Sequence, residues 1–256
     1  MSTIIDMFRL DGKVAIVTGS ERGLGRGMAT ALAGAGADIV GVTHAAHTPE
    51  TAAAVAAVGR RYVHVQADLK SIEPVQGIVE TTVREFGRVD ILVNNAGIIM
   101  RNDAVDFTEA EWDDVMDINL KTVFFLCQAV ARRFIQQGRG GKIINIASML
   151  SYQGGIRVPS YTASKSGVKG ITMLLANEWA KHRINVNAIA PGYMATDNTS
   201  QLRADEQRSN EILARIPAGR WGTPEDLGGA VVFLASAASD YVSGHTLAVD
   251  GGWLAR

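Results

Sequence analysis

The sequence predicts a doubly wound α/β fold in which helices cover both faces of a seven-stranded parallel sheet. Seven short runs rich in β-branched residues alternate with segments of helix length along the 256 residues. These runs are apolar almost throughout, which is typical of strands buried on both faces of a parallel sheet. Neither a Pro- or Ser-rich linker nor an internal repeat divides the chain, so we expect residues 1–256 to form a single domain.

The alternation places each element in order along the chain. The expected strands lie at residues 13–18, 38–43, 61–66, 90–95, 142–147, 183–190 and 246–250, with helix-length segments between them at 25–37, 74–87, 109–137 and 160–182. The long polar segment 191–224 breaks the alternation just after a strand. Because ligands of open α/β sheets bind beyond the carboxyl ends of the strands, we expect this segment to be a substrate lid. The alternative is a surface insert with no role.

Composition and charge argue against several classes of protein. Hydrophobic residues make up 47% of the chain, and the net charge is −1 without a basic stripe, so we expect a sizeable core and no nucleic-acid partner. The one cysteine, Cys127, cannot form an internal disulfide, which fits a reducing compartment. The N-terminus lacks a signal-peptide pattern, and no run reaches the ~18 apolar residues of a membrane span. We expect a cytoplasmic protein that binds no membrane and, because its five histidines are scattered, no metal.

A glycine-rich loop, TGSERGLG at residues 18–25, follows the first expected strand and precedes an alanine-rich segment. Glycines in this context permit a tight turn and a close approach of the backbone to a pyrophosphate, which the N–H groups of the following helix bind. The spacing G-x3-G-x-G differs from the commoner G-x-G-x-x-G, and glycine also serves any sharp turn. Because strand, loop and helix follow in the right order, the loop predicts a dinucleotide cofactor.

The end of the second strand leaves the choice of cofactor open. An acidic residue there would bind the ribose hydroxyls of NAD, whereas a nearby arginine would favour the 2′-phosphate of NADP. This chain has Val42, Thr43 and His44 at that point and no acid. Arg22, in the glycine loop, either reaches a 2′-phosphate or is a solvated loop residue. The residues alone therefore favour NADP slightly.

Tyr161 and Lys165 stand four residues apart in the sequence SYTASKSG, and side chains at this spacing share one face of a helix. A free tyrosine has a pKa near ~10, and a neighbouring ammonium favours the phenolate and lowers that pKa. We therefore expect Tyr161 to be a general base in alcohol oxidation and a general acid in carbonyl reduction. Ser148, after the fifth strand, can donate a hydrogen bond to the same substrate oxygen. The alternative is an exposed pair on a solvated helix.

These motifs resemble those of one known family, the short-chain dehydrogenases/reductases, over nearly the whole chain. The resemblance implies a single Rossmann-type domain, a homotetramer, and catalysis by Ser148, Tyr161 and Lys165. It also implies that Asn119 holds a water in a proton relay to the lysine; the alternative is a polar residue that bends a helix. The motifs that carry it, in the expected order, are TGSERGLG, Asn94-Asn95-Ala96-Gly97, Ser148, Tyr161-x3-Lys165, Pro191-Gly192 and the ending VDGGW.

The same resemblance implies which positions bind the cofactor. Asp68 resembles the residue that meets the adenine amino group, and Thr196 resembles the residue near the nicotinamide carboxamide. Lys165 is expected to hold the nicotinamide ribose, and Asn94 is either part of this site or a structural residue of the sheet. The cofactor-binding positions implied are Gly19, Arg22, Gly23, Leu24, Gly25, Thr43, Asp68, Leu69, Asn95, Ala96, Gly97, Tyr161, Lys165, Pro191, Gly192 and Thr196.

The residues around Ser148 and Tyr161 and in segment 191–224 resemble a bacterial subgroup that acts on ring-opened sugar acids. This resemblance implies oxidation of a secondary alcohol, NAD as the usual cofactor, and a role in pectin or uronate breakdown. Arginine binds carboxylates through its bidentate fork, so Arg101 and Arg157 are candidates for the substrate carboxylate, with a salt bridge as the alternative. The expected substrate-binding residues are Arg101, Met149, Gln153, Arg157, Met194 and Asn198, with the amides reading hydroxyl groups and the methionines forming an apolar wall.

Two other functions stay open at this point. One is reduction of another carbonyl, such as 5-ketogluconate or a 3-ketoacyl thioester; a carrier-protein partner would favour a basic patch, and the balanced charge gives no sign of one. The other is a dinucleotide-binding scaffold without turnover, which could lose Ser148, Tyr161 or Lys165, although this chain keeps all three. Trp253, near the C-terminus, either closes a neighbouring subunit's site or packs in the core.

Overall fold

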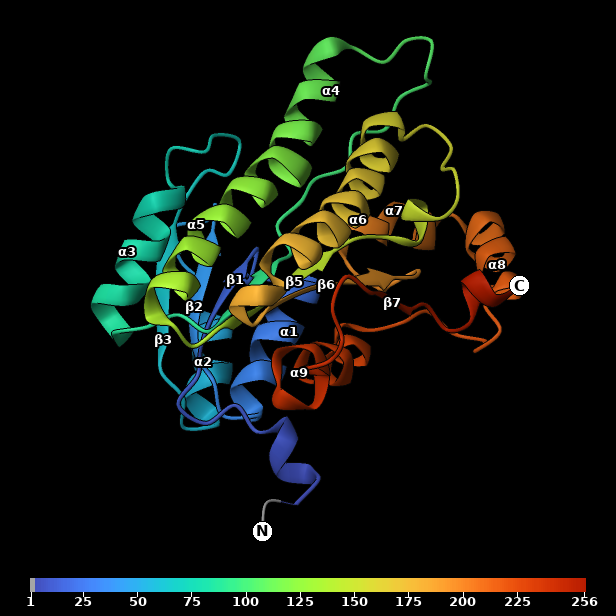
Figure 1. Ribbon diagram of the computed structural model, residues 1–256. Coiled ribbons are helices and arrows are strands. Elements are labelled where there is room, and N and C mark those ends of the chain that lie inside the picture. Colours follow the sequence, from blue (N-terminus) through green and yellow to red (C-terminus); the bar gives the residue numbers. More distant parts are fainter. Residues whose placement is uncertain (1–2) are drawn as a thin grey trace.

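The computed structural model describes residues 3–256, within which seven parallel strands form one sheet (Figure 1). The order β3-β2-β1-β4-β5-β6-β7 means that the direction of winding reverses between β1 and β4. The predicted α/β fold is confirmed, and each strand ends within one residue of its predicted limits. The strands are β1 (Val14–Thr18), β2 (Asp38–Thr43), β3 (Tyr62–Gln66), β4 (Ile91–Asn94), β5 (Gly141–Ile146), β6 (Ile184–Pro191) and β7 (Thr246–Val249).

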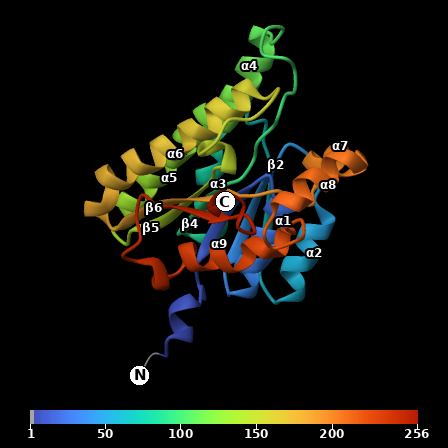
Figure 2. The same cartoon turned by 90° about the vertical axis from the view of Figure 1, so that its right-hand side faces the viewer.

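Helices cover both faces of the sheet, with α1, α2 and α9 on one side and α3, α5 and α6 on the other (Figure 2). Strand β1 shows why the strands are apolar throughout: Val14 and Ile16 enter one core, while Ala15 and Val17 enter the other. The helices are α1 (Gly23–Gly34), α2 (Pro49–Ala57), α3 (Val75–Phe86), α4 (Glu109–Met116), α5 (Thr122–Gln137), α6 (Pro159–Trp179), α7 (Ser200–Ala204), α8 (Glu206–Arg215) and α9 (Gly228–Ala235).

The helix-length segment 109–137 is interrupted in the structure. Thr108 starts α4 with a capping box, in which its side chain accepts the Glu111 N–H and the Glu111 side chain accepts the Thr108 N–H. A π-helical stretch, Asp117–Lys121, then separates α4 from α5. Such widened turns are frequent at functional sites, and this one carries Asn119.

Because β1 and β4 are neighbouring parallel strands, the loops that follow them lie at the same carboxyl end of the sheet, where the winding reverses. Ligands of open α/β sheets bind at such a point of reversal. Among the helices of residues 3–256, none combines the length and the apolar character needed to cross a bilayer.

Candidate active site

The loop after β1 forms a cradle at the N-terminus of α1. Gly19 and Gly23 have left-handed backbone conformations, with φ of 65° and 51°. A Cβ at Gly25 would collide with the carbonyl oxygen of Gly19, so the loop closes this tightly because these positions are glycine. The first N–H groups of a helix lack partners within it and favour an anion. The cradle therefore fits the pyrophosphate of a dinucleotide.

Thr18, the last residue of β1, ties this cradle to the loop after β4. Its hydroxyl oxygen accepts the backbone N–H groups of Asn95 and Ala96 at 3.0 and 2.9 Å. The Asn95 amide donates back to the carbonyl oxygens of Thr18 and Gly19 at 2.9 and 3.2 Å. The glycine motif and the Asn-Asn-Ala-Gly motif therefore lie side by side. The sequence prediction does not include Thr18, although a hydroxyl at the end of an apolar strand was a usable signal.

The end of β2 presents no negative charge to an adenosine ribose. The Thr43 hydroxyl donates to the carbonyl oxygen of Ala45 at 2.8 Å, so it must accept its second hydrogen bond from His64 Nε2, also at 2.8 Å. A 2′-phosphate would thus meet no carboxylate at this point. On the loop after β3, Asp68 is exposed and Leu69 is buried.

Arg22 forms an ion pair with Asp197, with 3.3 Å between Nη1 and Oδ2. Both side chains are mostly exposed, so the pair contributes little stability and Arg22 can exchange partners. Thr196, predicted near the nicotinamide, lies over the cradle: a Cβ at Gly23 would stand 3.6 Å from its methyl group. The start of segment 191–224 therefore covers the glycine loop.

The three predicted catalytic side chains converge between β5 and α6. Ser148 begins the short turn Met149–Ser151, and its Oγ accepts a backbone N–H at 3.1 Å. The Ser151 hydroxyl donates to the carbonyl oxygen of Lys165 at 2.7 Å, so this turn is bonded directly to α6. Ser148 also forms a side-chain hydrogen bond with Tyr161. The sequence prediction misses Ser151, the residue that sets this geometry.

Lys165 is buried close to Tyr161. Its ammonium donates to the carbonyl oxygen of Ile146 at 2.6 Å and lies 5.7 Å from the centre of the Tyr161 ring. Burial lowers the pKa of Lys165 to about 8. Desolvation raises the pKa of Tyr161, while the hydrogen bond with Ser148 and the charge of Arg101 lower it by less. The expected net lowering of the Tyr161 pKa is therefore wrong, because burial outweighs the hydrogen bond with Ser148 and the charge of Arg101.

Asn119, in the π-helical stretch, is fully buried against the loop after β4. Its side-chain amide forms two hydrogen bonds with the backbone of Ile98, both at 2.9 Å, and a third with Ser164 Oγ at 3.3 Å. Asn119 therefore fastens this loop to α6 next to Lys165. A water held between Asn119 and Lys165 stays a prediction.

Segment 191–224 is closed at its base by contacts between its two ends. Met194 and Gly222 form a parallel β-bridge, and the Ala195 N–H donates to the Gly222 carbonyl oxygen at 2.7 Å. Between these ends lie α7 and α8, in whose described residues a single side chain, Ile212, is buried. The segment thus has a fixed base and a lightly anchored outer part, which suits a lid.

Arg101 and Arg157, the predicted carboxylate ligands, have different partners. Arg101 donates to the carbonyl oxygen of Asn198 at 3.1 Å, and its charge acts on Tyr161. Arg157 instead pairs with Asp103 at 2.8 Å, from a backbone with a φ of 62°, which is uncommon outside glycine. Both side chains are exposed. Asn198 meets Arg101 through its backbone oxygen rather than through the predicted side-chain amide.

Met149, Gln153 and Trp253 lie in one small cluster. The Trp253 side chain is buried, and its indole N–H donates to Gln153 Oε1 at 3.1 Å. Met149 packs in the same cluster, whereas Met194 is buried in the core beneath α1 and α9. Trp253 therefore packs within its own chain, which decides between the two alternatives for this residue.

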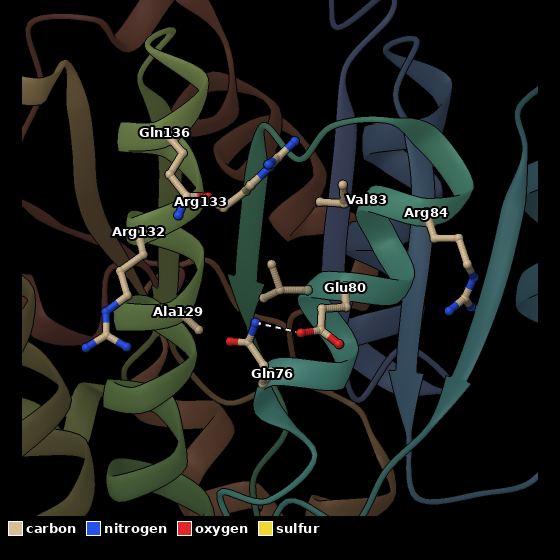
Figure 3. A pocket seen from close by; sticks show the side chains of 9 residues that line it. Gln76, Glu80, Val83, Arg84, Ala129, Arg132, Arg133 and Gln136 are labelled. Atoms are coloured by element: carbon tan, nitrogen blue, oxygen red, sulfur yellow. Dashed lines mark hydrogen bonds between the residues drawn. The ribbon is translucent and has the colours of Figure 1, made fainter.

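Two cavities differ in how they relate to the predicted site. One of about 220 Å³ lies at the end of β6, where its lining includes Gly192, just after Pro191. One of about 550 Å³ lies between α3 and α5, and Figure 3 shows Arg84 and Arg132 at its rim pointing away from the gap. No predicted site residue lines this larger cavity. We therefore locate the site from its chemical groups rather than from the size of a cavity.

The chain matches a protein-family model described as Enoyl-(Acyl carrier protein) reductase over residues 18–254. It is 67% identical to the 2-dehydro-3-deoxy-D-gluconate 5-dehydrogenase of Escherichia coli (strain K12) over 253 residues, which cover 99% of this chain and 100% of that protein. It is 53% identical to the Bacillus subtilis (strain 168) protein of the same name, with both chains covered in full. A solved gluconate 5-dehydrogenase from Burkholderia cenocepacia, in complex with NADP and tartrate, matches with a TM-score of 0.94 at 40% identity over 99% of this chain and 100% of that one.

Proposed function

Because this chain belongs to the short-chain dehydrogenase/reductase family and is an NAD(P)-dependent oxidoreductase acting on CH–OH groups, we propose that its substrate is 2-dehydro-3-deoxy-D-gluconate or 2-deoxy-D-gluconate. The enzyme oxidises a secondary alcohol of this acid or reduces the matching ketone. The observation that carries the proposal is the 67% identity over 253 residues to a 2-dehydro-3-deoxy-D-gluconate 5-dehydrogenase. The Burkholderia relative that acts on gluconate is 40% identical, so 5-ketogluconate is the second candidate.

The proposed mechanism assigns each proton to a group of this chain. In oxidation, the Tyr161 phenolate takes the proton of the substrate hydroxyl, and in reduction the phenol returns it. Ser148 donates a hydrogen bond to the oxygen that carries the developing charge. Lys165, whose pKa is lowered by burial to about 8, stabilises the Tyr161 phenolate as long as the lysine itself is protonated. The hydride chemistry would come from a nicotinamide cofactor held by the glycine cradle and Lys165.

The proposed cofactor is NAD, on the ground of the resemblance to the sugar-acid subgroup, and NADP is accepted as well because the residues at the adenosine ribose fit its 2′-phosphate. The cradle at Gly19, Gly23 and Gly25 would hold the pyrophosphate, and Lys165 would hold the nicotinamide ribose. At the end of β2, Thr43 stands where an acidic residue would repel a 2′-phosphate. Arg22 can leave Asp197 and bind that phosphate. The remaining cofactor positions proposed are Leu24, Asp68, Leu69, Asn95, Ala96, Gly97, Tyr161, Pro191, Gly192 and Thr196.

We propose Arg101 as the main ligand of the substrate carboxylate. Its charge acts on Tyr161, which supports a position near the reacting carbon. Arg157 is the weaker candidate, because it pairs with Asp103 and Arg101 is the arginine whose charge acts on Tyr161. Segment 191–224 is the proposed lid, because Arg101 also donates to the backbone of Asn198 within it. Met149, Gln153, Met194 and Asn198 complete the proposed substrate site.

The proposed assembly is a cytoplasmic homotetramer whose partner is the small sugar acid rather than nucleic acid. Large apolar side chains on the helices α5 and α6 support an interface there: Ile135, Met173 and Leu174 are each more than two-fifths exposed. Light scattering on the purified protein would test the assembly, and a mass of one chain would contradict it.

The test of function follows absorbance of the reduced nicotinamide with 2-dehydro-3-deoxy-D-gluconate and NAD or NADP in parallel. We expect turnover with NAD and a smaller rate with NADP. Tyr161→Phe should lower kcat at least ~10²-fold, because the acid–base group is lost, and should leave cofactor affinity nearly unchanged. No turnover by the wild-type protein with either cofactor would reject the substrate, and 5-ketogluconate would be tested next.

A further inference from the structure

We propose that Trp253 is a positioning residue for substrate binding: its indole N–H holds the Gln153 side-chain oxygen, so the amide N–H₂ group of Gln153 is left to donate to an oxygen of the sugar acid. This inference rests on the proposed function and deepens it. It concerns a residue 100 positions away in the sequence from the one on which it acts.

The indole is held firmly enough to orient its partner. Trp253 is 4% exposed, and the residues on either side of it are held by Asp250, whose carboxylate accepts the N–H groups of Gly252 and Leu254, both at 2.9 Å. The hydrogen bond to Gln153 Oε1 is 3.1 Å long. An immobile donor in this position fixes which end of the Gln153 amide faces it.

The chemistry of the two groups determines the orientation. An indole N–H can donate only, so the Gln153 oxygen, rather than its nitrogen, must face Trp253. Gln153 Nε2 has no hydrogen-bond partner among residues 3–256. The backbone of Gln153 is itself held, because its N–H donates to the Met149 carbonyl oxygen at 3.2 Å, on the turn that starts at Ser148. The unpaired amide hydrogens of Gln153 therefore lie on the same loop as Ser148. A sugar acid has hydroxyl, keto and carboxylate oxygens that could accept them.

Trp253 also links this loop to the proposed lid. The Tyr193 ring meets its edge with centroids 4.7 Å apart, and the Arg215 guanidinium of α8 lies 4.0 Å from its ring centre. Ile212 and Ile216 pack in the same cluster, and Figure 1 shows the C-terminus beside α8. Movement of α8 would therefore displace the indole and, through its hydrogen bond, the Gln153 amide.

The kinetic test uses Trp253→Phe, which keeps an aromatic ring but removes the N–H donor. We expect the KM for 2-dehydro-3-deoxy-D-gluconate to rise about threefold to tenfold, with kcat and the KM for the cofactor within twofold of wild type, as for loss of one oriented hydrogen bond. Trp179→Phe is the control, because Trp179 ends α6, packs against the core on the other face of the sheet, and has an indole N–H without a partner within residues 3–256. An equal rise in the control, or a fall in kcat with unchanged KM, would overturn the proposal.

A double-mutant cycle tests whether Trp253 acts through Gln153. If it does, Gln153→Leu should raise the substrate KM, and Trp253→Phe added to it should have no further effect. Independent, additive effects would mean that Trp253 only supports the fold.

A spectroscopic arm separates this proposal from the proposed substrate. The protein has four tryptophans, so its ¹H–¹⁵N spectrum should show four indole N–H signals, and Trp253→Phe identifies one of them. Gln153→Leu should shift that signal and speed its exchange with solvent while it leaves the others in place. An unmoved signal would reject the hydrogen bond, whatever substrate the enzyme turns over.

Discussion

Tyr161 is subject to two opposing effects that a sequence motif does not weigh. Packing around the phenol raises its pKa, while the hydrogen bond with Ser148 and the charge of Arg101 lower it. Burial also disfavours the charged form of Lys165 and lowers its pKa to about 8. The spacing of Tyr161 and Lys165 predicts that they are neighbours, but the direction of each pKa shift depends on what surrounds them.

Replacing Arg101 should move the pH profile of alcohol oxidation. Its charge favours the Tyr161 phenolate, so Arg101→Met should shift the midpoint of the kcat profile to higher pH. Arg101→Lys, which keeps the charge, should shift it less. Arg157→Met serves as the control, because that guanidinium is paired with Asp103. The prediction fails if the Arg101→Met and Arg157→Met profiles have the same midpoint.

Lys165 should make the stability of the fold depend on pH in the alkaline range. Its pKa is about 8 in the folded protein and near 10.5 in an unfolded chain, so between these values the unfolded state holds the extra proton. Stability therefore rises with pH in this window, by at most ~1.4 kcal/mol per pH unit. Below pH 8 the cost of the buried charge is fully present.

Urea unfolding at pH 7.5, 8.5 and 9.5 would measure this effect against Lys165→Met, which lacks the titrating group. We expect the free energy of unfolding of the wild-type protein, measured relative to that of the variant, to increase with pH. Other titrating groups, such as Cys127, whose pKa burial raises to about 12, act in both proteins and cancel in the comparison. A difference that stays constant across the series would contradict the burial of a charged lysine.

A buried chain of polar side chains joins β4, β5 and α6 near the predicted catalytic residues. Asn94 donates its amide to Asn145 Oδ1 at 2.9 Å, and Asn145 donates to Thr172 Oγ1 at 3.0 Å. The Thr172 hydroxyl then donates to the carbonyl oxygen of Val168 at 2.7 Å. Because buried polar groups are costly when unpaired, this chain of hydrogen bonds fixes the position of α6 along the strands of the sheet. Asn94 is thus a structural link between strands, one of the two roles that its motif allows.

Thr172→Val should destabilise the fold by about 1–3 kcal/mol, because it leaves the buried Asn145 amide without its acceptor. Thr82→Val is a matched control: Thr82 is also fully buried in a helix and donates to the carbonyl oxygen four residues before it, at 2.8 Å, without a second side-chain partner. Urea unfolding of both variants measures the difference. Equal losses would mean that the link between Asn145 and Thr172 adds nothing.

Across the whole molecule, segment 191–224 and the sheet should differ in local stability. The strands are buried between two cores, whereas in segment 191–224 the helices α7 and α8 rest on few buried side chains. We expect backbone amides of residues 200–215 to exchange with deuterium much faster than those of β1 and β4, as in weakly anchored segments generally. Addition of NADP and a sugar acid should slow exchange in this segment, and mass spectrometry of peptides would show it. Uniform exchange rates would argue against a lid.

The fold was predictable because its signals are local. A parallel sheet needs strands that are apolar on both faces, and short β-branched runs such as Val14–Thr18 show this directly in the sequence. The same holds for the glycine loop and for the spacing of Tyr161 and Lys165, since a turn or a helix is set by residues near one another in the chain. The break in the helix at Asp117–Lys121 was not predicted, because no residue pattern there marks a π-helical turn.

The sequence by itself therefore determined the doubly wound architecture, the cofactor cradle and the identity of the catalytic candidates. The tertiary structure alone decided how distant segments meet: Thr18 with Asn95 across 77 residues, Gln153 with Trp253 across 100, and Arg101 rather than Arg157 as the charge acting on Tyr161. It also decided that burial raises the pKa of the Tyr161 phenol. These properties depend on distances and on solvent exclusion between residues far apart in the chain, and local periodicity carries no information about either.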